Sequence, residues 1–237
     1  MKLKDLTIKL FADGADIVTM LDLYKNPLIK GFTTNPSLMK KSGITDYRKF
    51  AIEILQMIPD RPISFEVFSD ELPEMKRQAL AINAWAENVY VKIPITDSKG
   101  KTTFTLIEDL AQRGVKQNVT ALTTLEQVAQ VSRSLGTDTQ AYISVFAGRI
   151  ADTGIDPVPL MAKAVELLKD KPNQALIWAS PREVLNIIQA ENVHCHIITL
   201  TNEIFRKLDW IGRDLNEVSL ATVKMFREDA LEAEFVL

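Results

Sequence analysis

The sequence predicts an α/β protein built as a single (β/α)8 barrel, the TIM-barrel fold, with an additional C-terminal helix. Eight short apolar segments alternate with longer amphipathic segments along the 237 residues, which is the order of a parallel barrel. The length is usual for one such barrel. A doubly wound open sheet usually carries a glycine-rich phosphate loop, and neither G-x-G-x-x-G nor G-x-x-x-x-G-K-[ST] occurs here. We therefore expect 1–237 to form one barrel domain, with 210–237 as a helical extension.

The apolar segments have the length and composition of buried strands. They are rich in β-branched and aromatic residues, and Gly, Pro, Asn or Asp often lies beside them. In chain order, the predicted strands are 7–13, 30–34, 63–67, 89–94, 115–120, 140–145, 175–180 and 193–199.

The segments between these strands are predicted to be helices, because their apolar residues recur at spacings of three and four. The clearest examples are 45–58, 72–87, 102–114 and 158–170. After residue 209 the pattern changes, and the chain is predicted to be helical to about residue 232, with Asp214 and Asn216 as candidate caps. This helix could pack on the outside of the barrel or dock on a neighbouring subunit, and the sequence favours neither.

Composition indicates a soluble globular protein, with 46% hydrophobic residues, 25% charged residues and a net charge of −3. This balance gives no general basic surface, so we expect no nucleic-acid and no membrane partner. The sole cysteine, Cys195, lies in an apolar stretch, which predicts a buried structural thiol in a reducing compartment. We find no signal peptide and no stretch of 18 apolar residues, so a cytoplasmic location is expected.

Polar side chains gather where the predicted strands end, which is where TIM barrels place their active sites. Asp13, Glu66 and Lys92 stand out, because they occupy three separate apolar strands at similar depth. An ionised group buried alone is costly, so we expect these three residues to pair with one another. A purely structural ion cluster is one interpretation of this pattern. A catalytic site is the other.

Lys92 lies within the apolar run VYVKIPIT (89–96). A lysine amine that is partly neutral can attack a carbonyl and form a Schiff base, and a nearby carboxylate can take a hydroxyl proton as the adjacent C–C bond breaks. A strand would hold the amine rigidly for this purpose. The chemistry needs no metal and no cofactor, so neither is expected. His194 and His196 could face the same way on one strand, but no third ligand accompanies them.

Four segments, in order along most of the chain, resemble motifs of the transaldolase family. They are GFTTNPSLM (31–39), VYVKIPIT (89–96), ISVFAGRIADTG (143–154) and WASPR (178–182). The resemblance implies Schiff-base chemistry on Lys92, with Asp13 as the general acid/base. Glu66 and Thr120 would hold a catalytic water. The substrate-binding residues it implies are Asn35, Asn118 and Ser144 at the hydroxyls of the dihydroxyacetone unit, and Arg149, Ser180 and Arg182 at the phosphate. Thr34 and Phe146 are further substrate-binding candidates.

The family contains two kinds of enzyme. Transaldolases pass a dihydroxyacetone unit from a ketose phosphate to an aldose phosphate, and fructose-6-phosphate aldolases release it as free dihydroxyacetone. Glu66, Phe146 and Arg182 match the transaldolases, because the aldolases typically have glutamine, tyrosine and lysine there. We therefore expect a transaldolase acting on small sugar phosphates. An aldolase and a non-catalytic sugar-phosphate-binding protein are the alternatives.

The sequence also departs from the family pattern. Phe32 replaces a smaller residue, 117–127 is a loose version of the fifth-strand motif, and Trp178 and Pro181 are unusual in their setting. These differences leave the acceptor sugar open. Short members of the family often form rings of five that pair into decamers through the C-terminal helix, so a homo-oligomer is expected, with a pentamer and a decamer as the candidate states.

Overall fold

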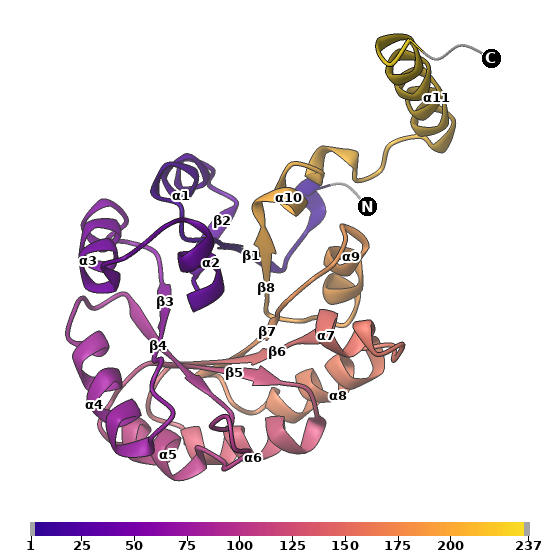
Figure 1. Cartoon of the computed structure of the whole chain (residues 1–237). Coiled ribbons are helices and arrows are strands. Elements are labelled where there is room, and N and C mark those ends of the chain that lie inside the picture. The colour runs from indigo at the N-terminus through magenta and orange to yellow at the C-terminus, as the bar shows by residue number, and fades with distance from the viewer. Residues whose placement is uncertain (1–2, 235–237) are drawn as a thin grey trace.

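Eight parallel strands form a closed barrel in a computed structural model that describes residues 3–234 (Figure 1). Each strand pairs with the next along the chain, and β1 closes the ring against β8. The predicted (β/α)8 fold is confirmed. The strands are β1 Lys9–Asp13, β2 Ile29–Thr33, β3 Ile63–Glu66, β4 Val89–Pro94, β5 Gln117–Leu122, β6 Ala141–Val145, β7 Gln174–Trp178 and β8 Ile197–Thr201.

At least one helix follows each strand, and the helices surround the barrel (Figure 1). Two short 3-10 helices, Leu3–Asp5 and Leu208–Trp210, lie near the two ends of the described chain. The α-helices are α1 Ile17–Tyr24, α2 Pro36–Lys41, α3 Tyr47–Met57, α4 Leu72–Asn83, α5 Phe104–Gln112, α6 Leu125–Leu135, α7 Ala147–Asp152, α8 Val158–Leu168, α9 Leu185–Asn192, α10 Asn202–Phe205 and α11 Leu215–Glu232.

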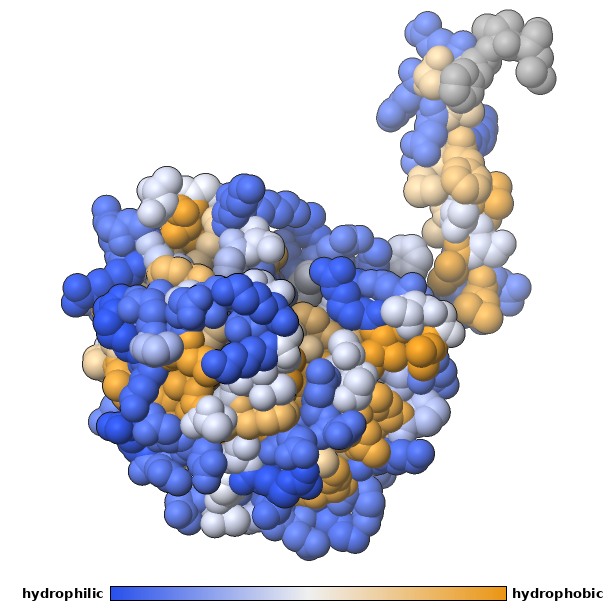
Figure 2. All heavy atoms as spheres, turned by 60° about the horizontal axis from the view of Figure 1, so that its bottom comes forward, coloured by the Kyte–Doolittle hydropathy of each residue, from blue (hydrophilic) through white to orange (hydrophobic). Residues whose placement is uncertain are grey.

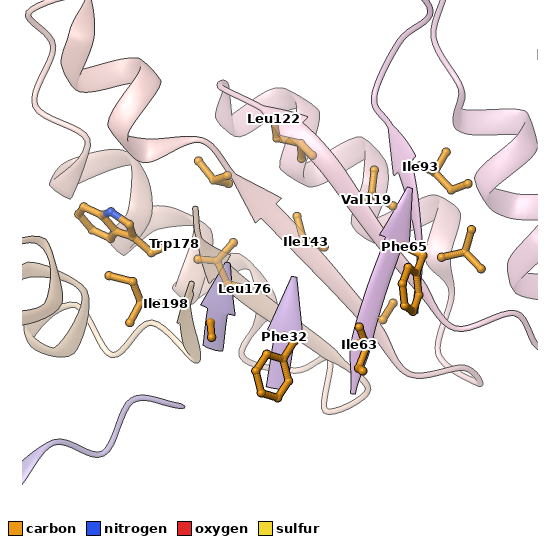
Figure 3. Close-up of a cluster of buried hydrophobic side chains, with 14 of the residues drawn as sticks. Phe32, Ile63, Phe65, Ile93, Val119, Leu122, Ile143, Leu176, Trp178 and Ile198 are labelled. Atoms are coloured by element: carbon orange, nitrogen blue, oxygen red, sulfur yellow. The ribbon is translucent and has the colours of Figure 1, made fainter. Parts of the chain in front are cut away.

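The main hydrophobic core lies between the outer face of the barrel and the helices. Side chains alternate between the two faces of each strand, and the outward-facing ones, including Phe32, Phe65 and Trp178, are fully buried (Figure 3). Phe32, which departs from the family pattern, therefore packs against helices and does not line the interior of the barrel. Trp178 is likewise a core residue of the outer layer.

A second, smaller apolar cluster fills part of the barrel interior. Phe11, Ile177 and Ile197 are its large buried members, with Tyr142 packed edge-on against Phe11 at a ring-centroid distance of 5.6 Å. Gly31 makes room for it, because a Cβ atom there would lie 2.5 Å from the ring of Phe11. This apolar filling leaves the polar inward-facing residues at the C-terminal end of the barrel.

Three predicted strand boundaries were wrong at positions that bear on function. The strand predicted at 193–199 begins only at Ile197, and His194 sits before it with a φ of 56°. His194 and His196 therefore do not share a strand. The strand predicted at 175–180 ends at Trp178, and Ser180 has a φ of 59°. The strand predicted at 115–120 runs from Gln117 to Leu122, and a bulge at Ala121, which has a φ of 67°, shifts its register with β6.

The predicted C-terminal helix is present as α11, and Asp214 caps it by accepting hydrogen bonds from the backbone N–H groups of Asn216 and Glu217. Asn216 is thus inside the helix and is not a cap. α11 projects away from the barrel (Figure 1), and none of its residues is buried. Packing on the outside of its own barrel, one of the two arrangements left open, is therefore not observed. None of the helices in 3–234 is long and apolar enough to cross a membrane.

Candidate active site

Lys92 projects from the middle of β4 and is only 6% exposed. Its Nζ atom lies 3.0 Å from Oε2 of Glu66, which is in direct register with it on β3. The same amine donates a hydrogen bond of 2.8 Å to the backbone carbonyl of Thr34. The strand lysine is therefore held from two sides, and its charge is compensated by a carboxylate that is itself mostly buried.

Asp13, at the end of β1, is partly buried. Burial raises the pKa of its carboxyl above the ordinary value, while the charge of Lys92 and a hydrogen bond from Thr33 oppose that shift. Of the predicted pairing among Asp13, Glu66 and Lys92, the structure shows the ion pair between Lys92 and Glu66. Asp13 is instead hydrogen-bonded to Thr33.

A short chain of hydroxyl groups orients Asp13. The Thr33 hydroxyl donates to Oδ1 of Asp13 at 2.8 Å and lies 2.6 Å from the Thr199 hydroxyl. A hydroxyl has one proton, so Thr33 must accept from Thr199 when it donates to the carboxylate. The sequence analysis assigned no role to Thr33 or Thr199. Side chains alternate between the two faces of a strand, so the inward orientation of both residues could have been inferred from inward-facing residues two positions away.

A second polar chain continues from the lysine around the barrel. Asn118 is in register with Lys92 on β5, donates to the Ser64 hydroxyl at 3.0 Å and accepts from the Ser144 hydroxyl at 2.7 Å. All three of these uncharged side chains are buried. Thr120, two residues further along β5, has a buried hydroxyl oxygen with no hydrogen-bond partner. A buried polar atom of this kind usually has a partner such as an ordered water.

Two of the predicted substrate-binding residues, Thr34 and Asn35, already make hydrogen bonds to the backbone. The Thr34 hydroxyl donates to the Ser64 carbonyl at 2.8 Å, so Thr34 offers its own carbonyl, not its hydroxyl, to Lys92. Asn35 is the N-cap of α2 and accepts from the Leu38 backbone N–H at 2.9 Å. Capping uses the side-chain oxygen of Asn35, which leaves its amide group free to donate elsewhere.

The residues predicted to bind phosphate lie on the loops that follow β6 and β7. Phe146 begins this region and packs against the apolar interior cluster, while Arg149 is exposed on α7. Ser180 and Arg182 follow β7. The two loops touch at Gly148, where a Cβ atom would lie 1.6 Å from the carbonyl oxygen of Ser180. Glycine is required at this contact.

Neither the histidines nor the cysteine joins the site. His196 accepts a hydrogen bond from the Leu176 backbone N–H, and burial raises the pKa of the Cys195 thiol to about 12. No group of three or more His, Cys, Asp or Glu side chains within the described part of the chain is placed to hold a metal ion. The arrangement that remains is a buried amine with two carboxylates and a ring of neutral hydrogen-bonding groups. Such a set can perform carbonyl addition and proton transfer.

Comparisons with known proteins point to one enzyme family. A family model described as Transaldolase/Fructose-6-phosphate aldolase matches residues 10–236. A probable transaldolase of Dehalococcoides mccartyi is 32% identical over 202 residues, which cover 85% of this chain and 90% of that protein. A probable transaldolase of a Thermoanaerobacter species is 30% identical over 223 residues, covering 94% of this chain and 96% of the relative.

A solved structure supports the fold independently. The crystal structure of 2,3-dimethylmalate lyase, a member of the PEP mutase/isocitrate lyase superfamily, superposes with a TM-score of 0.55. The superposition covers 96% of this chain and 84% of that one at 14% sequence identity, so the likeness concerns the barrel alone. The family model extends over nearly the whole chain, including every segment that lines the site. The chain belongs to the transaldolase/fructose-6-phosphate aldolase family of enzymes.

Proposed function

We propose that this protein is a transaldolase that transfers a dihydroxyacetone unit from a ketose phosphate, such as fructose 6-phosphate or sedoheptulose 7-phosphate, to an aldose phosphate through a Schiff base on Lys92. The observation that carries the proposal is the buried amine of Lys92, held 3.0 Å from Glu66 and close to Asp13 at the C-terminal end of the barrel strands. The probable transaldolases to which the chain is similar support the same assignment.

In the first step, the amine of Lys92 adds to the C2 carbonyl of the open-chain ketose. The ammonium must first lose a proton, and the Glu66 carboxylate lies within hydrogen-bond distance to accept it. Returning that proton to the C2 hydroxyl lets water leave and produces the protonated imine. Bound substrate would separate Lys92 from Glu66. A water held between Glu66 and the Thr120 hydroxyl, which has no hydrogen-bond partner among the described residues, would then carry these protons.

In the second step, Asp13 removes the proton of the C4 hydroxyl. The electrons of the C3–C4 bond then move toward the imine nitrogen, which leaves an enamine on Lys92 and releases an aldose phosphate as the aldehyde. Attack of the enamine on the acceptor aldehyde reverses these events, and Asp13 returns its proton to the new hydroxyl. The hydroxyl chain of Thr33 and Thr199 holds Asp13 for both transfers.

Neutral side chains would bind hydroxyl groups of the substrate, and cationic side chains would bind its phosphate group. Asn118 and Ser144, already bonded to each other, are placed to bind the hydroxyls of the dihydroxyacetone unit. Arg149 and Arg182 supply guanidinium groups that can bind a phosphate through paired hydrogen bonds. Glu66, Phe146 and Arg182 match transaldolases, not fructose-6-phosphate aldolases, and this match supports transfer over simple release.

The test is borohydride reduction in the presence of fructose 6-phosphate, followed by intact mass and peptide mapping. We expect a stable dihydroxyacetone-derived adduct on Lys92, and none in Lys92→Arg, which keeps the charge. Turnover should require an aldose phosphate acceptor. Release of free dihydroxyacetone without acceptor would instead identify an aldolase. Absence of an adduct with every ketose phosphate tried would leave the lysine as part of a structural ion cluster and overturn the proposal.

We also propose that the protein is a homo-oligomer in which α11 packs on a second copy of the chain. Five large apolar side chains of α11 lie on one half of its circumference at 3.6 residues per turn and are 55–80% exposed: Leu215, Leu220, Val223, Phe226 and Leu231. Met225, which is 47% exposed, lies on the other half. Figure 2 shows the hydrophobic residues along the projecting helix. An isolated helix with this surface needs a partner to bury it.

The oligomer proposal is tested by sedimentation equilibrium of the full chain and of Phe226→Asp. We expect the full chain to associate and the variant to dissociate while retaining its far-ultraviolet circular dichroism. A monomeric full chain at micromolar concentration would contradict the proposal.

A further inference from the structure

One ion pair joins the two loops of the proposed phosphate site. Asp152, the last residue of α7, accepts hydrogen bonds from Nε and Nη2 of Arg182, which follows β7; the Nε–Oδ1 distance is 2.9 Å. The two residues are 30 positions apart in sequence, so the pair joins α7 to the segment that follows β7. Arg182 and, to a lesser degree, Arg149 hold the pKa of the Asp152 carboxyl below its ordinary value.

The rest of the loop contact holds the same arginine in place. The backbone N–H of Arg182 donates to Oδ1 of Asn186 at 2.7 Å, which anchors the base of the side chain. Gly148 lies one helical turn before Asp152, and a Cβ atom there would lie 3.3 Å from Nε of Arg182. α7 therefore presents to Arg182 a face that has no side chain at one end and a carboxylate at the other.

The pairing leaves the guanidinium group able to bind a second anion. Asp152 occupies the edge formed by Nε and Nη2, and within the described residues no hydrogen bond reaches Nη1. A guanidinium group carries five N–H donors, so its other edge, formed by Nη1 and Nη2, can still bind an oxyanion through two parallel hydrogen bonds. Asp152 and a phosphate can thus be bound at the same time.

From this geometry we infer that Asp152 is a positioning residue, which acts through Arg182 to orient it for the phosphate group of the substrate. The inference rests on the proposed function, because it assumes a phosphorylated sugar in this site. An arginine side chain that is already held loses less conformational entropy when it binds its ligand. Arg149 and Arg182 keep a net positive charge of one when Asp152 is counted, so the carboxylate does not cancel attraction for a phosphate.

The test compares wild type with Asp152→Ala, the conservative Asp152→Glu and the control Asp109→Ala. Asp109 lies on α5. It is a suitable control because its carboxylate also accepts a hydrogen bond from an arginine Nε, that of Arg113, at 3.1 Å. Three quantities are measured: KM and kcat with fructose 6-phosphate, affinity for inorganic phosphate by calorimetry, and the rate of borohydride trapping with dihydroxyacetone, which has no phosphate.

We expect Asp152→Ala to raise KM and the dissociation constant of phosphate by roughly two- to five-fold, the range of a partly exposed ion pair. Trapping with dihydroxyacetone should be unchanged, Asp152→Glu should recover part of the loss, and Asp109→Ala should behave as wild type. Tighter phosphate binding in Asp152→Ala would make Asp152 a competitor of the ligand, and equal losses with dihydroxyacetone would make its role merely structural. Either result overturns the inference.

The two proposals fail in different ways. If wild type forms no ketose adduct on Lys92, the proposed function is wrong, and the calorimetric comparison with inorganic phosphate still decides whether Asp152 orients Arg182. If wild type is trapped normally but Asp152→Ala binds phosphate as well as wild type does, only the inference about Asp152 is wrong.

Discussion

Replacing Lys92 by methionine tests whether the central ion pair is as tightly coupled as its geometry indicates. The charges of Lys92 and Glu66, 3.0 Å apart, attract each other by about 6 kcal/mol at an effective dielectric constant of about 20. Desolvation of both groups offsets part of this attraction. Methionine fills a similar volume but leaves Glu66 without its cation and the Thr34 carbonyl without its donor.

The expected loss of stability follows from burial. Removing one member of a buried pair typically costs about 3–5 kcal/mol. The side chain of Glu66 is 18% exposed and gains some hydration, so we take the lower end, about 3 kcal/mol at pH 7. For a chain of this length that corresponds to a fall in Tm of roughly 6–12 °C. Activity should be lost completely, because the proposed Schiff base forms on the amine of Lys92.

Urea unfolding of wild type, Lys92→Met, Glu66→Gln and the double variant forms a double-mutant cycle. We expect a coupling free energy of about 2 kcal/mol or more, because removing both charges relieves the cost of leaving either one alone. A coupling below about 0.5 kcal/mol would refute the reasoning, since it would place Lys92 and Glu66 in solvent-like surroundings.

Three further predictions concern Asp13 and the interior of the barrel. Asp13→Asn should abolish activity but stabilise the fold at pH 7. The folded-state pKa of the Asp13 carboxyl is raised, so this group increasingly destabilises the fold as the pH rises above about 4. In urea unfolding, the gain in free energy of unfolding of Asp13→Asn over wild type should therefore be smaller at pH 4 than at pH 7. An equal gain at both pH values would contradict the raised pKa of Asp13. Thr33→Val removes a hydrogen bond that lowers the pKa of Asp13, so the acid limb of the kcat/KM profile should move to higher pH; an unmoved limb would exclude Asp13 as the titrating base. Gly31→Ala places a Cβ atom 2.5 Å from the Phe11 ring and should cost about 1–3 kcal/mol in thermal unfolding, with partial recovery in Gly31→Ala/Phe11→Leu; a neutral single variant would show that the interior is loosely packed.

Local patterns in the sequence were enough to predict the barrel and the strands that carry its buried charged residues. The alternation of short apolar runs with helical periodicity depends only on neighbouring residues, and it correctly indicated eight strands in order. The polar residues that interrupt those runs were visible for the same reason. A lysine within VYVKIPIT cannot be buried without a partner, so the sequence alone predicted that Lys92 would meet Glu66 and Asp13.

Only closure of the barrel decided which distant side chains touch. Thr33 meets Thr199 across 166 positions of the chain, and Asp152 meets Arg182 across the gap between two loops. The bulge at Ala121 and the left-handed turns at Ser180 and His194 also escaped prediction, because none of these residues is a glycine, the residue that usually marks a positive φ. These features arise from burial and pairing between segments far apart in sequence, and no local pattern encodes the geometry that brings such segments together.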